Sequence, residues 1–319
     1  MAPLSNDTAD LVPRTEFDGR VLRFDLPGLE VGVAEYDEGP TGCTVFHFPG
    51  GAACATDVRG GSSGTLGGAE WVRAICFAGG SLYGLEAGAG VAAELLARGG
   101  YEVGWTSVWP VSAAIIFDFR RESTIYPDKE LGRAALRAAR PGVFPLGARG
   151  AGRSATVGKT FALERGEPAG QGGAFRTVGP TRIAVFVVVN AFGAIVDRDG
   201  TVVRGHLDTE GVGRLPLVPE IERRIAAGET PGYRAPESTT LTLVVTNQRL
   251  ERRPLRQLGR QVHASLARAI QPFHSLVDGD VLYVATTNEV ENPALDSVSL
   301  GVVASELAWD AVLACFDTD

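Results

Sequence analysis

The chain has 319 residues and a mass of 33.5 kDa, and its 45% hydrophobic and 21% charged residues exclude a disordered chain. The net charge of −8 argues against a nucleic-acid partner. Glycine is abundant at 41 residues but shows no Gly-X-Y period, which excludes collagen and predicts many tight turns.

The hydrophobic pattern predicts a mixture of strands and helices in chain order. Up to residue 197, we expect strands within 29–49, a glycine-dense loop over 50–68, a helix over 81–98 and buried strands at 111–119 and 181–197. After a polar, proline-containing stretch, we expect a strand from Thr239, a helix near 253–272, a strand at 280–288 and a last helix over 294–316. With no repeat or linker, this predicts one α+β domain over 1–319, with helices outside packed sheets.

The N-terminal region and the apolar segments predict a cytoplasmic protein without membrane association. Residues 1–19 show neither the basic nor the apolar part of a signal peptide. The longest apolar run, 183–196, is too short to span a bilayer and contains Asn190. The four cysteines and four histidines lack metal-binding spacings, so we expect buried thiols, no metal and no cofactor.

Several motifs imitate known signatures without their structural context. Residues 60–64 match GxSxG, but glycine-rich sequence on both sides replaces the strand and helix of a nucleophile elbow, so a structural turn is the better interpretation. Residues 152–160 resemble a phosphate-binding loop with one residue too many between the glycines. Gly88 and Gly90 lie in a helical pattern and indicate close packing. The arginines of 249–260 indicate a solvated helix face.

The junction at Thr239 offers a different chemistry. A threonine at the start of a strand is usually just a good β-former, and that explanation suffices for this feature alone. If the chain cuts itself there, however, the new α-amine has a pKa of about 7.7–8.0 and can serve as general base for the hydroxyl of the same residue. Such an enzyme needs no catalytic histidine.

Four further residues fit an N-terminal nucleophile. Lys159 is one of only two lysines, and a nearby cation lowers the pKa of an amine and stabilises developing negative charge. Asn190 interrupts the most apolar strand and could donate to an oxyanion. Asp278 and Asp280 lie two apart on an extended segment, so they share one side, where they could orient the amine, the hydroxyl or Lys159. A simple turn is the alternative explanation for this pair.

Five segments in order resemble the L-aminopeptidase/D-esterase and β-aminopeptidase family, which includes the 6-aminohexanoate-oligomer endohydrolases. They are DVRGGSSGT (57–65), FAGGSLYGLEAGAGV (77–91), GARGAGRSATVGK (147–159), VVVNAFG (187–193) and STTLTLVVTN (238–247). The resemblance extends over most of the chain. It implies an αββα-type sandwich similar to N-terminal-nucleophile hydrolases.

The resemblance also implies how the chain matures and which residues act. Cleavage between Ser238 and Thr239 would give a larger subunit, 1–238, and a smaller one, 239–319, that stay together. Thr239 would be the nucleophile. Lys159 and Asn190 match the assisting lysine and the oxyanion asparagine of the family, and Asp278 with Asp280 matches the acidic pair of its nylon-hydrolase branch.

The expected activity is therefore endo-hydrolysis of 6-aminohexanoate oligomers, with an L-amino-acid or β-amino-acid aminopeptidase as the alternative and a non-enzymatic protein of this fold as a second one. The family resemblance further implies a homo-oligomer, a tetramer of heterodimers. Two departures matter. Ser238 replaces the Asn or Gly of the relatives, which leaves Ser238 or Thr240 as alternative nucleophiles. Phe117 replaces a Tyr found in some relatives, which shifts oxyanion binding toward Asn190.

Overall fold

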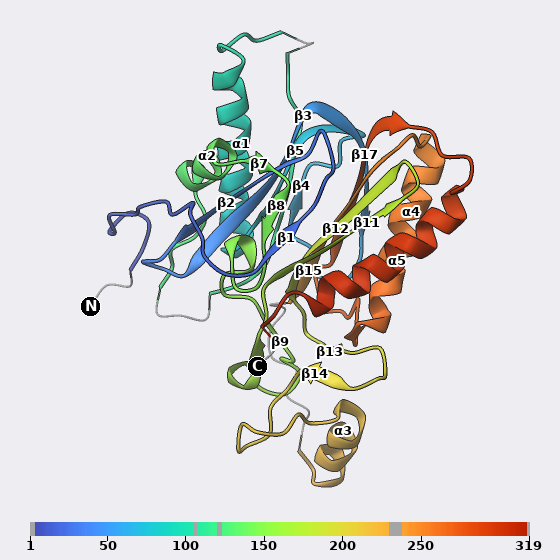
Figure 1. Ribbon diagram of the computed structural model, residues 1–319. Coiled ribbons are helices and arrows are strands. Elements are labelled where there is room, and N and C mark those ends of the chain that lie inside the picture. Colours follow the sequence, from blue (N-terminus) through green and yellow to red (C-terminus); the bar gives the residue numbers. More distant parts are fainter. Residues whose placement is uncertain (1–3, 105–106, 120–122, 230–237, 318–319) are drawn as a thin grey trace.

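The computed structural model describes residues 4–104, 107–119, 123–229 and 238–317 of the uncut chain (Figure 1). The strands in the first half are β1 (Val21–Arg23), β2 (Glu30–Tyr36), β3 (Thr41–Val58), β4 (Thr65–Leu66), β5 (Trp71–Ala78), β6 (Val111–Ile115), β7 (Arg140–Pro141), β8 (Val143–Pro145) and β9 (Thr156–Val157). The later strands are β10 (Glu167–Pro168), β11 (Gln171–Val178), β12 (Thr181–Asn190), β13 (Ala194–Val196), β14 (Val202–Arg204), β15 (Thr239–Gln248), β16 (Ile270–Gln271) and β17 (Val281–Val290).

Five α-helices and four short 3₁₀ turns complete the secondary structure of the described residues. The helices are α1 (Leu85–Arg98), α2 (Lys129–Arg137), α3 (Leu217–Ala226), α4 (Arg252–Ser265) and α5 (Ser297–Leu313). The 3₁₀ turns are η1 (Ser81–Gly84), η2 (Gly150–Gly152), η3 (Leu163–Arg165) and η4 (Leu266–Arg268). Within the described ranges, no helix combines the length and the apolar character needed to cross a bilayer.

The strands form two stacked layers between two pairs of helices. The main sheet has the order β11-β12-β15-β17-β3-β5-β6-β4, and β2 also pairs with β3. The long strand β3 joins the two layers, because residues 41–47 pair with β2 while residues 53–58 pair with β17. Figure 1 shows α1 and α2 on one side of the strands and α4 and α5 on the other.

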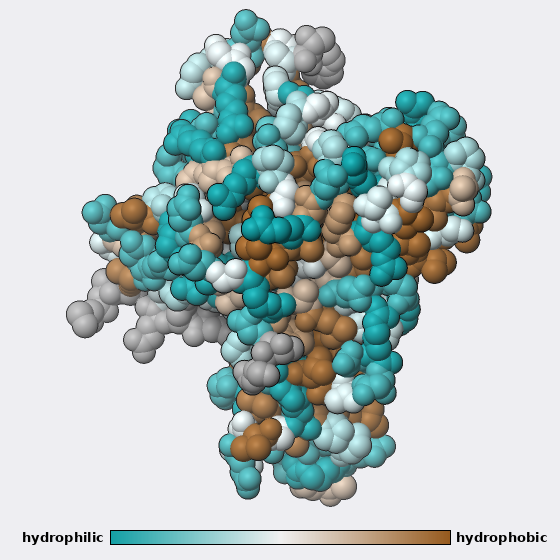
Figure 2. All heavy atoms as spheres, viewed as in Figure 1, coloured by the Kyte–Doolittle hydropathy of each residue, from teal (hydrophilic) through white to brown (hydrophobic). Residues whose placement is uncertain are grey.

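Three apolar cores fill the spaces between these four layers. One lies between α1, α2 and the β2-β3-β5-β6 layer, one between the two strand layers, and one between β12, β15, β17 and the helices α4 and α5. Strand β12 shows how the sequence divides them: Val185 and Val187 belong to the core under α4 and α5, and Phe186 belongs to the core between the strand layers. The expected αββα sandwich is thereby confirmed. On the face shown in Figure 2, hydrophilic residues cover much of the surface.

The same alternation orients the start of β15. Leu241 and Leu243 belong to the core between the strand layers, so the side chain of Thr239 lies on that inner face. Asn190 is directly opposite Thr239 in the antiparallel β12–β15 pair and shares its face. Asp280 directly precedes β17, whose Val281 points inward, so its side chain lies on the opposite face, toward α4.

Parts of the fold differ from the expectations. The predicted loop over 50–68 is largely strand, because β3 continues to Val58 and pairs with β17. The predicted strand 181–197 is split into β12 and β13 at Gly193, where an added Cβ would lie 2.2 Å from the carbonyl oxygen of Pro272. The polar stretch before Thr239 contains the helix α3, and the helix expected to reach residue 272 ends at Ser265. The four cysteines are free and buried, as expected.

Three buried histidines are expected to make the fold sensitive to acid. Burial lowers the pKa of His47, His206 and His263 from 6.5, so each binds more protons when the chain unfolds. Stability should therefore fall as the pH drops through the ordinary histidine range. We expect a lower melting temperature at about pH 5 than at about pH 7, and a smaller drop for His263→Gln. Identical drops in the two proteins would contradict this account for His263.

Candidate active site

Six buried residues meet at the end of β15 that begins with Thr239. None of them is more than 4% exposed. They are Ser238, Thr239, Lys159, Asn190, Asp278 and Asp280, the same residues that the sequence singles out. Residues from four distant parts of the chain thus lie in one place, because β12 and the segment before β17 both border β15.

The peptide bond between Ser238 and Thr239 is held by two donors. The Thr239 hydroxyl donates to the Ser238 carbonyl oxygen at 2.6 Å, and the Gly279 N–H donates to the same oxygen at 2.8 Å. The hydroxyl oxygen therefore lies beside the carbonyl that precedes its own residue. An added Cβ at Gly279 would lie 2.8 Å from Thr239 Oγ1 and 2.6 Å from the Ser62 carbonyl oxygen. Only glycine therefore fits at this position without displacing its neighbours.

Lys159 and Asn190 form a second buried unit. The Lys159 ammonium donates to both the backbone oxygen and the side-chain Oδ1 of Asn190, each at 2.8 Å. Asn190 Oδ1 also accepts from the Thr156 N–H at 3.1 Å, while its Nδ2 donates to the Phe117 carbonyl at 3.0 Å. These contacts fix the amide's orientation, with its oxygen toward the lysine and its NH₂ group toward residue 117.

The two aspartates mainly hold backbone N–H groups. Asp278 accepts from Phe192 N–H at 3.2 Å and from the Ser275 hydroxyl at 2.5 Å. Asp280 Oδ1 accepts from Thr240 N–H at 2.7 Å. Burial raises the pKa of Asp278, and the charge of Asp280 raises it further. The pair thus fixes the segments that carry the nucleophile and the lysine contacts, rather than the Thr239 side chain itself.

His274 is a site residue that the sequence interpretation missed. Its Nδ1 lies 2.9 Å from Asp280 Oδ2, and its backbone N–H donates to the same oxygen at 3.1 Å. Its ring meets that of His263 edge to face at 4.4 Å, and His263 Nδ1 lies 2.9 Å from Asp57 Oδ2. The available signal was a histidine six residues before Asp280, but no metal or nucleophile motif contains that spacing.

The GxSxG stretch supports the site from outside. Ser62 N–H donates to the Asp278 carbonyl at 3.0 Å, and an added Cβ at Gly60 would lie 2.2 Å from that carbonyl oxygen. The Ser62 side chain is exposed, and although β3 ends at Val58 just before it, the short strand β4 follows instead of the helix that a nucleophile elbow needs. The prediction of a structural turn is confirmed, and the glycines allow its backbone to approach the segment beside Thr239.

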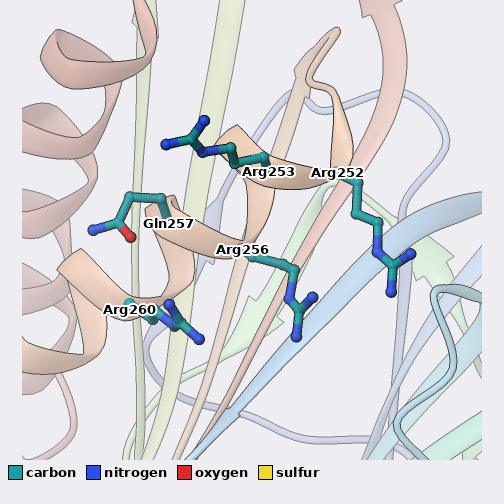
Figure 3. Close-up of a pocket in the computed structure, with 5 residues that line it drawn as sticks. All are labelled: Arg252, Arg253, Arg256, Gln257 and Arg260. Atoms are coloured by element: carbon teal, nitrogen blue, oxygen red, sulfur yellow. The ribbon is translucent and has the colours of Figure 1, made fainter.

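Two other sequence motifs are structural as well. An added Cβ at Gly90 would lie 2.1 Å from the Lys129 carbonyl oxygen, which confirms close packing of α1 on α2. Figure 3 shows the arginine-rich segment on α4, beside a hollow of about 730 Å³. The residues that line it are Arg252, Arg253, Arg256, Gln257 and Arg260. The arginines are exposed, as expected for a solvated helix face, and they supply no nucleophile or general base.

No group of three His, Cys, Asp or Glu side chains within the described ranges is arranged to hold a metal ion. The chemistry that the clustered residues can support is acyl transfer, since a hydroxyl and a backbone N–H contact one carbonyl group, with an ammonium, an amide and two carboxylates buried on neighbouring segments.

Comparison with known proteins agrees with this chemistry. The family model of peptidase family S58 matches residues 24–317. A 6-aminohexanoate-oligomer endohydrolase from Agromyces sp. (strain KY5R) is 48% identical over 97% of this chain and 89% of its own length.

Two solved structures share the fold at low sequence identity. An L-aminopeptidase D-Ala-esterase/amidase from Ochrobactrum anthropi, described as a variant of the Ntn hydrolase fold, has a TM-score of 0.67 at 15% identity and covers 94% of this chain and 88% of its own. A β-aminopeptidase from Burkholderia sp. has a TM-score of 0.65 at 15% identity, covering 95% of this chain and 89% of its own. The chain belongs to peptidase family S58 and is a hydrolase of amide bonds.

Proposed function

We propose that this chain is a self-processing N-terminal-threonine hydrolase that cleaves 6-aminohexanoate oligomers at internal amide bonds. The observation that carries the substrate is the 48% identity to a 6-aminohexanoate-oligomer endohydrolase over almost the whole chain. The aminopeptidase structures that share the fold make an L-amino-acid or β-amino-acid aminopeptidase the alternative. The contact between the Thr239 hydroxyl and the Ser238 carbonyl supports the choice of Thr239 as the nucleophile.

Processing begins with attack of Thr239 Oγ1 on the Ser238 carbonyl carbon. The Gly279 N–H, 2.8 Å from the carbonyl oxygen, stabilises the charge that develops there. The C–N bond then breaks and the nitrogen takes a proton, which leaves an ester between Ser238 and the Thr239 hydroxyl. Water hydrolyses this ester and releases residues 1–238 and 239–319, with a free α-amine on Thr239.

In turnover, the Thr239 amine removes the hydroxyl proton as the oxygen attacks the substrate amide. Lys159 favours the neutral form of this amine by its positive charge and, through Asn190, anchors the strand opposite the nucleophile. Asn190 is the proposed side-chain donor to the substrate oxyanion. Asp278 and Asp280 keep residues 192 and 240 in register. The leaving amine takes the proton, and water releases the acyl group.

A substrate comparison separates the proposal from the alternative. The purified enzyme is incubated with N-blocked 6-aminohexanoate oligomers and with L-amino-acid and β-amino-acid p-nitroanilides. Internal cleavage of the blocked oligomers, followed by mass spectrometry of the products, is expected. Hydrolysis of only the p-nitroanilides would instead identify an aminopeptidase, because that activity needs a free amino terminus.

Gly279→Ala is expected to slow self-cleavage at least tenfold, because losing or misplacing one oxyanion donor has an effect of at least this size. The new methyl group would crowd Thr239 Oγ1 and the Ser62 carbonyl, so the N–H and the hydroxyl cannot both keep their positions. The rate of appearance of the smaller subunit on denaturing gels measures this. Gly211→Ala is the control, since an added Cβ there meets nothing within 4 Å, although its φ of +73° adds local strain. Equal cleavage rates would contradict the role of Gly279.

His274 is a positioning residue in this account, because it acts through Asp280. We expect His274→Phe to lower kcat about tenfold or more. Asp280 loses the ring donor that orients it, so it no longer accepts from the Thr240 N–H in the same position. His274→Asn keeps a donor near the Nδ1 position and is expected to recover much of that loss. Both variants are compared by kcat and KM and by the pH profile of kcat. Equal losses with asparagine and phenylalanine would show that the ring only fills space.

A further inference from the structure

A row of aromatic rings begins beside the active site and leads away from it. We call Phe117, Phe119, Tyr83 and Tyr126 the aromatic strip. Consecutive ring centres are separated by 5.5, 6.3 and 5.7 Å. Tyr83 is 67% exposed, and the other three are partly exposed. By contrast, most large aromatic side chains between the strand layers are fully buried.

Hydrogen bonds fix the backbone segments that carry these rings. Asp118 is buried and accepts from the Thr41 hydroxyl at 2.8 Å and from the Gly80 N–H at 2.7 Å. Its neighbours in sequence, Phe117 and Phe119, therefore project to the other side of this extended segment. Gly80 and Ser81 both have positive φ, 76° and 53°, and the Ser81 N–H donates to the Ile116 carbonyl. Positive φ at a non-glycine residue is uncommon, and here it turns Tyr83 outward.

Two separate routes of contact connect the aromatic strip to Thr239. On one side, Asn190 lies opposite Thr239 and donates to the Phe117 carbonyl at 3.0 Å. On the other side, Gly279 packs between Thr239 and Ser62 in the GxSxG turn. Two residues beyond Ser62, an added Cβ at Gly64 would lie 3.5 Å from Leu82, the neighbour of Tyr83. Both routes end on the backbone segments that carry the strip, which places the strip next to the active site.

The far end of the strip opens into a hollow of about 490 Å³. Tyr83, Phe119 and Tyr126 line it together with residues 5–7 and 123–124. The N-terminal segment is fixed there, because Asn6 accepts from the Tyr126 N–H at 3.0 Å and donates to its carbonyl at 3.1 Å. The hollow is thus lined by aromatic rings and by an N-terminal segment that is hydrogen-bonded to Tyr126.

We propose that the aromatic strip is an extended subsite that binds a polymethylene segment of an oligoamide, remote from the bond being cut. This rests on the proposed function of Thr239. An amide of long methylene units carries polar groups only at wide intervals, so it needs an unbroken apolar floor such as a row of rings. At ~1.2 Å per backbone bond, as in an extended peptide, one 6-aminohexanoate unit is about 8 Å long, so the strip can accommodate at most about two units.

The test compares substrates of different length on matched variants. For each protein, kcat/KM is measured on the linear dimer and the linear tetramer of 6-aminohexanoate, after a denaturing gel has established how far each preparation is processed. We expect the tetramer-to-dimer ratio of kcat/KM to fall about tenfold in Tyr83→Ala, which is the size of effect expected when one methylene contact is lost. Tyr83→Phe retains the ring and should retain the ratio. Tyr101→Ala removes a similarly exposed ring at the other end of α1 and should retain it too.

An unchanged ratio in Tyr83→Ala would overturn the subsite. A binding experiment separates this outcome from failure of the proposed function. Calorimetric titration of the tetramer into Thr239→Ala, with and without Tyr83→Ala, requires no hydrolysis. The subsite predicts a Kd about tenfold higher in the double variant, and equal values would refute it. If the wild-type chain hydrolyses no oligomer, the proposed function fails, whereas the titration still decides whether the strip binds the oligoamide.

Discussion

Thr239→Ala is expected to give a single full-length chain with no detectable amide hydrolysis, a loss of at least about 1,000-fold in kcat. The hydroxyl that lies 2.6 Å from the Ser238 carbonyl oxygen is the group proposed to cut the chain and then the substrate. Its removal takes away both reactions, while the space left by the hydroxyl and the γ-methyl group is small. Denaturing electrophoresis and an oligomer-hydrolysis assay on the same preparation measure the two effects.

Two control variants distinguish Thr239 from its neighbours. Thr239→Ser keeps a hydroxyl and, after cleavage, an α-amine, so it should still cut itself and hydrolyse amides. Thr240→Ala removes the adjacent hydroxyl but keeps the backbone N–H of residue 240, which donates to Asp280. This variant should therefore also be processed. Cleavage at the same bond in Thr239→Ala would assign the nucleophile to another residue, with Ser238 and Thr240 as the candidates.

Lys159→Arg is expected to lower kcat/KM at least 100-fold, although the charge is retained. Lys159 is 3% exposed, and its ammonium makes two contacts of 2.8 Å with a single asparagine. A planar guanidinium is larger and spreads its donors over a fork, so it cannot make both contacts in the same buried space without moving Asn190. Steady-state kinetics on the oligomer substrate, together with the extent of self-cleavage, measure the effect.

The second lysine offers a matched control for this substitution. Lys129 is exposed at the start of α2, and Lys129→Arg should leave kcat/KM within about twofold of the wild type, as is usual for surface substitutions. A Lys159→Arg enzyme as active as this control would show that position 159 needs only a positive charge. The scarcity of lysine in the chain would then reflect composition alone.

Much of the fold followed from short-range patterns. The apolar run within 181–197 predicted a buried strand, and the β-branched residues from Thr239 predicted another. That Thr239 and Asn190 share a face became apparent only from the pairing of these strands in the structure. The arrangement of these strands as an αββα sandwich came from the family resemblance, because periodicity alone does not tell which strands stack. Lys159 and Asn190 were singled out because they are unusual in their local sequence, whereas the choice of Thr239 as the nucleophile came from the family resemblance.

What could not be predicted depends on contacts between distant segments. The break at Gly193 arises from a close approach to Pro272, and the continuation of β3 through a glycine-rich stretch depends on its pairing with β17. Asp278 and Asp280 share a segment, but the groups that they hold are decided by packing. For the same reason the position of His274, six residues before Asp280, did not identify it, since its proposed role comes from the carboxylate that it contacts in the folded chain.

The central claim is that the chain cuts itself before Thr239 and works through the threonine that this exposes. Mass spectrometry of the purified, untreated protein tests it most directly. The account predicts two chains, of which the smaller comprises residues 239–319 and begins with a free Thr239 amine. A preparation that consists only of the intact 33.5 kDa chain and yet hydrolyses oligoamides would contradict it.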